Sequence, residues 1–290
     1  MKLQIIQEKL KEGLGMVEKI SSKSLTLPIL NNILISSEKN FLNLAATDLE
    51  IGINWWSLAK NEKEGKITIP SHLLSNFVNL LPNEIINIKV ENNNLFIECK
   101  NYKTQIKGIS ADEYPIIPKI IEGEFILVDN FSFCKSLAQV VDIPVLSTIR
   151  PEISGIYFSF QKNLIQMAAT DSFRLGEKKI FLKETNLKNS YSFILPQKAA
   201  KEIINIFSDK NGEIKICFSP NQIMFEFGMT EIKHPQIQLI SRLIEGEYPN
   251  YQEIIPKKYQ TQLILNKNEF LNQIKSASLF SGKVSEIKIK

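Results

Sequence analysis

The sequence predicts an α+β protein made of tandem repeated domains, each with two helices packed on antiparallel sheet. Three observations predict this class. Residues 27–51 and 150–175 repeat each other, and at a constant offset of 123 residues the segment Ala46-Thr47-Asp48 corresponds to Ala169-Thr170-Asp171. Short runs that alternate apolar and polar residues are separated by polar turns, which is typical of strands. Each repeat also contains stretches with apolar residues at helical spacing.

The elements of the first repeat follow from these patterns in order. Gly13 and Gly15 weaken the first helix, since glycine is a poor helix former. Pro70 stands before the second helix, as is common at helix starts. The expected elements are a strand at Leu3–Ile6, a helix at Lys9–Ile20, strands at Ile33–Ile35 and Phe41–Ala45 joined by the turn Ser36–Asn40, a helix at Ser71–Leu81, and strands at Ile86–Val90, Leu95–Cys99 and Lys103–Lys107.

The second repeat follows the same order. The offset of 123 residues places Leu10, Leu14 and Val17 on Phe133, Leu137 and Val140, so both first helices are expected to bury the same face. Helices are expected at Phe131–Val141 and Gln197–Phe207. Each repeat closes on a Tyr-Pro segment, DEYPIIP at 112–118 and GEYPNYQEIIP at 246–256.

A third copy begins near the end of the chain. Residues 263–280 repeat the opening of the other two, with Phe270, Ile274 and Ala277 at helical spacing, and 283–290 alternate like a strand. A strand that ends without a partner leaves edge groups unpaired, so we expect a fragment of a longer protein. The expected domains are 1–122, 123–260 and 261–290, the last incomplete.

Composition bounds the function. The chain has 290 residues, 35 Lys+Arg against 31 Asp+Glu and 43% apolar residues, which excludes disordered and fibrous classes. No apolar run is long enough to span a membrane, and we expect a cytoplasmic protein. Three cysteines without CxxC spacing and only two histidines argue against a zinc site, and nucleotide-binding and hydrolase motifs are absent. No catalytic residue, metal or cofactor is expected.

The two Thr-Asp segments have two interpretations. Asp48 and Asp171 could form a carboxylate pair, but aspartate after a strand commonly accepts backbone N–H bonds in a turn, and this structural role is favoured because both copies share it. After the shared segment the copies differ, and Arg174 replaces Ile51. Copy two also carries additional apolar and aromatic residues, which suit either an anchor pocket for a partner's peptide or packing between domains.

The helices of the two repeats are poor in acidic residues. The expected helices 71–81, 131–141 and 197–207 hold Lys135, Lys198 and Lys201 against the single acid Glu202. Such faces can pass close to phosphates without reading sequence, although a solvated helix face is the alternative. Only three arginines occur, Arg150, Arg174 and Arg242, so each is a candidate for bidentate recognition unless the scarcity reflects coding bias toward lysine, isoleucine and asparagine.

These segments, in their order, closely resemble the bacterial DNA polymerase III beta subunits, the sliding clamps. The resemblance rests on LPILNNILI with LAATDLEI, ISADEYPIIP, MAATDSFRL, FILPQKAAKEII and SRLIEGEYPNYQEIIP, and it covers essentially the whole chain. It implies a DNA-clamp fold with three repeated domains and a head-to-tail homodimer ring. It also implies a function without catalysis: encircling duplex DNA and tethering DNA polymerase III subunits, the clamp loader and other proteins with clamp-binding motifs.

The resemblance also implies site residues. The pocket for partner peptides would be formed by Thr170, Ser172, Phe173, Arg174, Leu175, Pro249 and Ile254. Contacts to DNA would come from the loop with Lys23 and Ser24, from Arg150, and from the helix residues Lys135, Lys198 and Lys201.

The chain departs from the family at two places. The family often has Gly-His where this chain has Ser172-Phe173, and the larger aromatic side chain is expected to reshape the pocket. The third domain is also only begun, so the chain as given should hold half of the pocket. An alternative function is therefore a clamp-derived peptide-binding module that does not form a closed ring.

Overall fold

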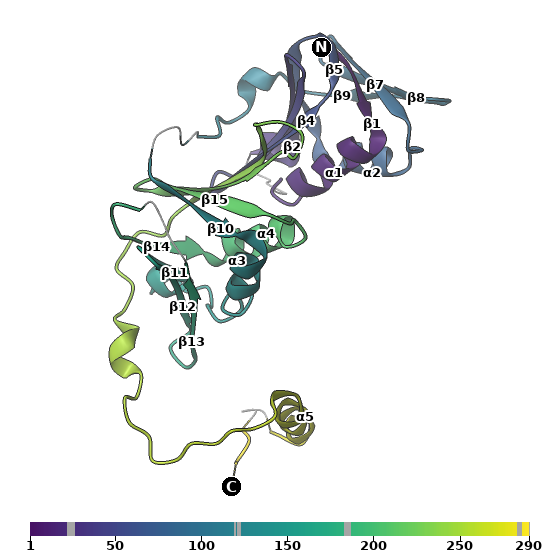
Figure 1. Cartoon of the computed structure of the whole chain (residues 1–290). Helices are drawn as coiled ribbons and strands as arrows, with labels where there is room; N and C mark the ends of the chain where they lie inside the picture. Colours follow the sequence, from purple (N-terminus) through teal and green to yellow (C-terminus); the bar gives the residue numbers. More distant parts are fainter. Residues whose placement is uncertain (22–26, 119, 121–122, 183–186, 283–285, 290) are drawn as a thin grey trace. The chain divides into compact units, whose positions relative to one another are not determined.

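The computed structural model describes residues 1–290 except 22–26, 119, 121–122, 183–186, 283–285 and 290. The chain divides into two compact units, Met1–Tyr248 and Pro249–Lys290, and each is described by itself. Figure 1 traces the chain from its N-terminus through both units. The larger unit contains both complete repeats.

The first repeat contains two helices and nine strands among its described residues. They are β1 (Lys2–Ile6), α1 (Gln7–Val17), the 3₁₀ turn η1 (Pro28–Asn31), β2 (Asn32–Glu38), β3 (Phe41–Thr47), β4 (Ile51–Leu58), β5 (Lys60–Lys63), β6 (Gly65–Pro70), α2 (Ser71–Asn79), β7 (Ile85–Glu91), β8 (Asn94–Cys99), β9 (Tyr102–Lys107) and η2 (Ala111–Glu113).

The second repeat has the same order among its described residues; the positions equivalent to β5, residues 183–186, lie outside them. Its elements are β10 (Phe125–Asp129), α3 (Asn130–Leu137), η3 (Pro151–Ile153), β11 (Gly155–Gln161), β12 (Leu164–Thr170), β13 (Leu175–Phe181), β14 (Tyr191–Pro196), α4 (Gln197–Phe207), β15 (Glu213–Phe218), β16 (Gln222–Gly228) and β17 (Pro235–Arg242). Strands β10, β11 and β12 begin and end 123 residues after β1, β2 and β3, so the sequence repeat is also a structural repeat.

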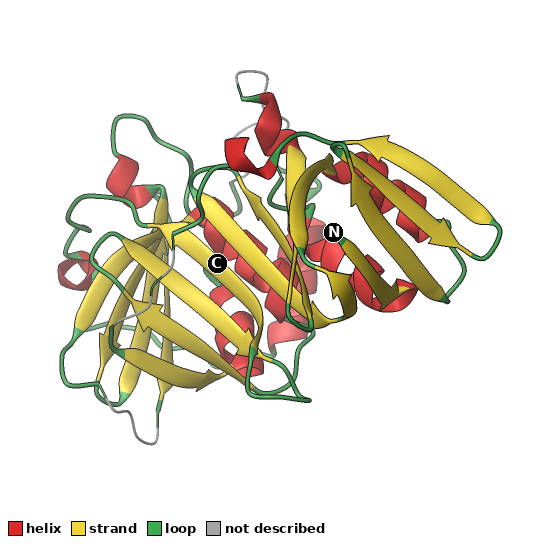
Figure 2. Cartoon of the chain, turned by 90° about the horizontal axis from the view of Figure 1, so that it is seen from above, coloured by secondary structure: helices red, strands yellow, loops and turns green. Residues whose placement is uncertain are grey.

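Three antiparallel sheets carry the larger unit (Figure 2). A five-stranded sheet has the order β5-β1-β7-β8-β9, and a four-stranded sheet has the order β13-β12-β11-β14. Between them an eight-stranded sheet runs β10-β15-β16-β17-β4-β3-β2-β6. Its central pair joins the repeats, because β17 of the second pairs with β4 of the first from Ile237↔Trp55 to Ser241↔Ile51.

The helices pair within each repeat, α1 with α2 and α3 with α4, and pack on the sheets (Figure 1). The aligned residues of α1 and of the α3 region are all buried, as the repeat predicts; they are Leu10, Leu14, Val17, Phe133, Leu137 and Val140. Gly13 lets the fully buried Trp55 ring lie directly against α1, because a Cβ there would come within 2.5 Å of the ring.

The structure corrects some element boundaries. Helix α1 begins at Gln7, whose buried side chain donates to the Val78 carbonyl at 2.8 Å, and ends three residues before Ile20. The second repeat's first helix ends at Leu137, and turns follow it. Strands β2 and β3 are longer than expected because pairing continues beyond their apolar residues, from Leu34↔Ala45 to Glu38↔Phe41.

The second unit contains η4 (Tyr251–Ile254) and α5 (Lys267–Ser278) among its described residues. The side chain of Asn266 caps α5 by accepting from the backbone of Asn268 and Glu269. The first helix of the third copy, α5, is therefore present where the repeat predicts it. The strand expected over 283–290 is wrong for residues 286–289, which form no strand, since a strand needs a partner for its backbone hydrogen bonds.

Candidate DNA and partner interface

The two Thr-Asp segments form the same turn in both repeats. Asp48 Oδ1 accepts from the N–H groups of Glu50 and Ile51 at 3.0 and 2.7 Å. Asp171 Oδ1 accepts from those of Phe173 and Arg174 at 2.9 and 2.6 Å. The structural interpretation of these aspartates is confirmed.

A left-handed residue and a threonine complete each turn. Leu49 and Ser172 have φ of 77° and 75°, a conformation that costs energy outside glycine and needs local hydrogen bonds to hold it. Thr170 supplies them in the second repeat, since its hydroxyl accepts from Ser172 N and donates to Arg174 O at 2.8 Å. Thr47 does the same in the first repeat. Both turns are therefore rigid platforms for the side chains that differ.

The Tyr-Pro segment fastens each turn, a role that the sequence patterns did not reveal. The Tyr114 hydroxyl donates to Asn32 O and accepts from Thr47 N at 3.2 Å. Burial raises the pKa of Tyr114 to about 12. Tyr248 is its counterpart: burial raises its pKa to about 12 as well, and the backbone of Thr170 is its hydrogen-bonding neighbour. The repeated tyrosine thus ties the end of each repeat to that repeat's turn.

The second turn exposes the residues that distinguish it. Phe173 is 97% exposed, although it lies on a rigid turn. Arg174 Nε lies 2.9 Å from Asp171 Oδ2, which orients the guanidinium. The backbone N–H groups of Arg174 and Phe173, and then the guanidinium, lower the pKa of Asp171 to about 2. An exposed aromatic ring beside an oriented arginine is typical of a protein-binding surface.

The seven predicted pocket residues fall into both units. Thr170, Ser172, Phe173, Arg174 and Leu175 share the turn between β12 and β13 in the larger unit. Pro249 and Ile254 belong to the second unit, where Ile254 in η4 is 70% exposed. The structure therefore brings together the first five, and the complete pocket stays a prediction.

The first repeat has a crevice built from the same kinds of segments. It lies at the joint of β4 and β17, and its volume is about 80 Å³. The turn after β3 with the start of β4, the Tyr-Pro segment, the start of β16 and the end of β17 form its walls. The residues that line it are Thr47, Leu49, Glu50, Ile51, Gly52, Ile116, Pro118, Gln222, Ile240 and Arg242. Of these residues, the sequence singled out only Arg242, as one of three arginines suited to bidentate recognition.

The candidate DNA contacts that the structure describes all have partners. Lys198 on α4 pairs with Asp48 of the first repeat, and Lys201 lies 3.4 Å from Asp142. The Lys135 ammonium lies 5.5 Å from the centre of the Phe131 ring, and Arg150 pairs with Glu152 at 3.0 Å; Lys23 and Ser24 lie outside the described residues. The ion pairs of Lys201 and Arg150 lie at the surface and are weak, so a phosphate can compete for these cations, whereas the Asp48 carboxylate that pairs with Lys198 is only 6% exposed.

Polar contacts also join the helices of the two repeats. Lys210 Nζ lies 3.1 Å from Glu12, and Lys19 Nζ donates to Asn205 O at 2.9 Å. With the Lys198–Asp48 pair they support the β4–β17 joint. The patterns did not predict them, because their partners stand more than 140 residues apart in the sequence.

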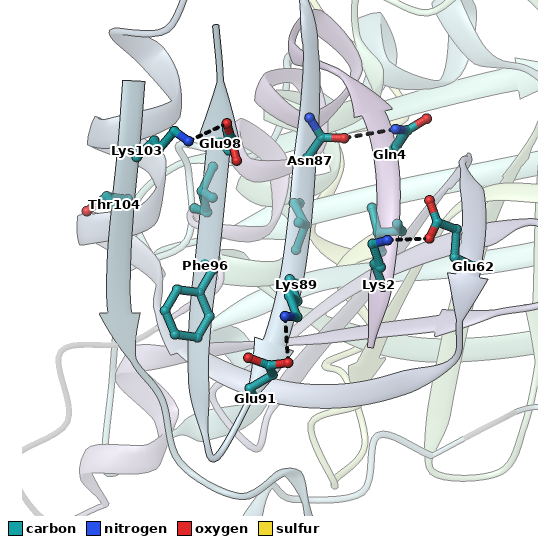
Figure 3. A pocket seen from close by; sticks show the side chains of 13 residues that line it. Lys2, Gln4, Glu62, Asn87, Lys89, Glu91, Phe96, Glu98, Lys103 and Thr104 are labelled. Atoms are coloured by element: carbon teal, nitrogen blue, oxygen red, sulfur yellow. Dashed lines mark hydrogen bonds and ion pairs between the residues drawn. The ribbon is translucent and has the colours of Figure 1, made fainter. Parts of the chain in front are cut away.

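A hollow on the five-stranded sheet is lined by paired charges (Figure 3). Its volume is about 450 Å³. Its charges neutralise one another in exposed pairs at 2.6–2.7 Å: Lys2 with Glu62, Lys89 with Glu91, and Lys103 with Glu98. Gln4 donates to Asn87 at 2.9 Å. The charged side chains of this lining are therefore all paired within the protein.

The described residues show no metal-type clustering of histidine, cysteine and acidic side chains. The same described residues contain no helix that is both long and apolar enough to cross a membrane.

Comparison with known proteins gives one consistent family. The model of the DNA polymerase III beta subunit N-terminal domain matches residues 1–118, and that of the central domain matches residues 132–250. The chain is 28% identical over 290 residues to the beta sliding clamp of Bacillus subtilis, covering 97% of this chain and 75% of the relative. It is also 28% identical over 274 residues to that of Staphylococcus epidermidis, covering 91% and 70%.

Solved structures agree with this result. The DNA polymerase sliding clamp from Bacillus subtilis superposes with a TM-score of 0.89 at 27% identity, covering 98% of this chain and 75% of that one. A putative DNA polymerase III beta subunit from Eubacterium rectale superposes with a TM-score of 0.90 at 27% identity, covering 98% and 76%. With two matched domains and the same fold, the chain belongs to the DNA polymerase III beta subunit family, the bacterial beta sliding clamps.

Proposed function

We propose that this protein is a processivity factor: as part of a closed ring it encircles duplex DNA and tethers the replicative polymerase, and it acts without catalysis. The observation that carries the proposal is the joint between the repeats. A clamp needs units that join edge to edge with the same geometry each time, and β4 with β17 is such a joint.

The repeat identifies the two edges at which further units would join. Strand β13 ends 123 residues after β4 ends, and β9 precedes its Tyr-Pro segment as β17 does. Both are edge strands of their sheets. A further unit added at β13, and another at β9, would repeat the existing joint head to tail. Such heterologous joints form a ring when the rotation closes.

The inner surface suits a ring that slides. Contacts to backbone phosphates carry no sequence information, and few of them keep binding weak and salt-dependent. We propose that Lys23, Ser24, Lys135, Arg150, Lys198 and Lys201 make such contacts. The partners would be duplex DNA in the cytoplasm, DNA polymerase III subunits and the clamp loader. Tethering then raises the local concentration of the polymerase at the primer end.

The predicted peptide pocket is part of the proposal. The crevice in the first repeat supports it, because there the Thr-Asp turn and the Tyr-Pro segment line one hollow. Their counterparts in the second repeat are the turn 170–175 and the segment with Pro249 and Ile254. We also propose the domain boundaries 1–122, 123–260 and 261–290.

Topology gives the decisive experiment. The protein is loaded by its clamp loader onto nicked circular DNA, and the complex is separated from free protein by gel filtration. The protein should stay on the circle at moderate salt and leave when one restriction cut linearises it. Retention on linear DNA would contradict the ring and favour a protein that grips DNA.

The edge strand gives a second test. The hydrogen bond from Gly108 N to Asn93 O sets the alternation of the β8–β9 ladder, so the N–H of Gln105 points to the open side. Gln105→Pro removes this donor, whereas Gln105→Ala keeps it. Sedimentation analysis should show weaker self-association only for the proline variant. Equal association of both variants would exclude β9 as a joint.

The pocket is tested by binding the C-terminal peptide of the polymerase subunit. Phe173→Ala with Arg174→Ala should weaken its binding, and the matched control Leu49→Ala with Glu50→Ala changes the turn of the first repeat. Unchanged binding by the Phe173 and Arg174 variant would remove the pocket assignment.

A further inference from the structure

The crevice in the first repeat combines exposed apolar side chains with a free charge. Ile116 is 93% exposed and Leu49 is 44% exposed, although both lie on anchored segments. The guanidinium of Arg242 has no hydrogen-bond or ion-pair partner among the described residues. Apolar surface beside an unpaired arginine marks a binding site more often than an exposed aliphatic residue alone.

The walls of the crevice are built before any ligand arrives. Ile117 of the Tyr-Pro segment and Ile120 just after it pack on a small core of Cys217, Met224 and Ile240, which turns the neighbouring Ile116 outward. A Cβ at Gly52 would lie 2.7 Å from Ile117, so glycine at this position lets the Tyr-Pro segment lie close to β4.

The opposite wall is fixed as well. Hydrogen bonds of Thr47, Asp48 and Tyr114 hold the turn that carries Leu49. The Arg242 backbone donates to Glu50 O at 2.9 Å, which ties β17 to the same turn. A site with both walls fixed loses little conformational entropy on binding.

Size and charge indicate the ligand. A volume of about 80 Å³ suits a single side chain, and the aliphatic walls of Leu49, Ile116 and Ile240 suit an aliphatic one. Arg242 presents a planar fork of donors that matches a carboxylate. Glu50 also lines the crevice, and its charge disfavours a ligand that carries several acids. An extended peptide with one aliphatic residue next to one carboxylate fits these constraints.

We infer that the crevice between Leu49, Ile116 and Arg242 is a second docking site of this chain, and that it binds a partner's extended segment through an aliphatic side chain and an adjacent carboxylate. The site is distinct from the pocket proposed at the turn 170–175. It lies wholly within the larger unit, so it is complete in the chain as given.

The test uses the full chain with labelled isoleucine δ-methyl groups and three synthetic tetrapeptides. The probe is acetyl-Ala-Asp-Leu-Ala-amide; one control replaces its Asp by Asn, and the other replaces its Leu by Ala. Methyl NMR spectra are recorded while the peptide is added. The probe should give saturable chemical-shift changes at the methyl groups of Ile116 and Ile240, and none at the core residue Ile33. A millimolar dissociation constant is expected for so small a contact, and each control should bind roughly tenfold more weakly.

Protein variants assign the contacts. Arg242→Ala should weaken the probe roughly tenfold and make the Asp and Asn peptides equal, because a charge-assisted hydrogen bond is lost. Arg242→Lys should bind the probe more tightly than Arg242→Ala but more weakly than the wild type. Glu50→Gln should leave binding equal or tighter, and the exposed Lys63→Ala on β5 is the control for a general charge effect.

Several results would overturn the inference. Equal shifts with all three peptides, no shift at ten millimolar probe, or weaker binding in Glu50→Gln each contradict it. Shifts at Ile254 with Ile116 and Ile240 silent would place the peptide in the pocket of the second repeat instead. No DNA or loader is present, so failure of the ring proposal would not produce any of these results.

Discussion

Substitution by alanine at two glycines of one helix should change the free energy of unfolding in opposite directions. Gly13 and Gly15 both lie in α1, and alanine at either position should favour the helix by about 1 kcal/mol. Around Gly15 nothing lies within 4 Å of the added Cβ. At Gly13 the Cβ would lie 2.5, 2.6 and 2.7 Å from three atoms of the Trp55 ring.

The Trp55 ring cannot move aside easily. It is fully buried, and its strand β4 is paired on one side with β3 and on the other with β17. Overpacking of a filled core costs about 1–3 kcal/mol, and contact with a rigid ring on a doubly paired strand belongs at the upper end. After the gain in helix propensity, Gly13→Ala should lose about 2 kcal/mol, whereas Gly15→Ala should gain about 1 kcal/mol.

Urea unfolding followed by tryptophan fluorescence measures the difference. At the usual urea dependence for proteins, a gap of about 3 kcal/mol separates the two midpoints by roughly 1 M or more. Circular dichroism on the same samples checks that both probes report one transition. If Gly13→Ala were as stable as Gly15→Ala, the packing of α1 against Trp55 would be excluded as the reason for glycine at position 13.

Three further predictions follow from charged groups and thiols. The pKa of Asp171 is about 2, below its unfolded value near 3.9, so its contribution to stability is complete above that value and is lost as the pH falls through 2. Wild type should therefore lose more stability than Asp171→Asn between pH 5 and pH 2, and parallel losses would contradict the turn's role. Burial raises the pKa of Cys134 to about 12 and of Cys217 to about 11, so neither thiol should react with Ellman's reagent at pH 8 until urea unfolds the chain. A double-mutant cycle on Lys210 and Glu12 should give a coupling of about 1 kcal/mol, and zero coupling would show that the pair does not support the joint.

The sequence predicts local structure best where pattern and repeat agree. Helix α4 spans Gln197–Phe207, as the pattern predicts, because its apolar stripe and Pro196 mark both the face and the start. The offset of 123 residues also places β10, β11 and β12 correctly. The two aspartates follow the turn chemistry expected of their position. All of these depend on residues close in sequence.

Contacts between distant segments are not readable from such patterns. The register of β17 on β4 depends on how two complete repeats meet, and the sequence assigns no range to β4. The crevice needs Leu49, Ile116 and Arg242 together, which come from three separate segments. The Lys198–Asp48 pair spans 150 positions, so a lysine that seemed free on its helix is paired in the fold.

The unbroken eight-stranded sheet has a mechanical consequence. Separating the repeats would break the β17–β4 ladder from Ile237↔Trp55 to Ser241↔Ile51. It would also break the Lys210–Glu12 and Lys198–Asp48 ion pairs and expose the buried strand β4 to water. The chain also links the two halves covalently, so the separated edges would stay near enough to pair again. A ring of these units that must admit DNA would therefore open at the interface between two separate chains, while the β4–β17 joint inside each chain stays paired.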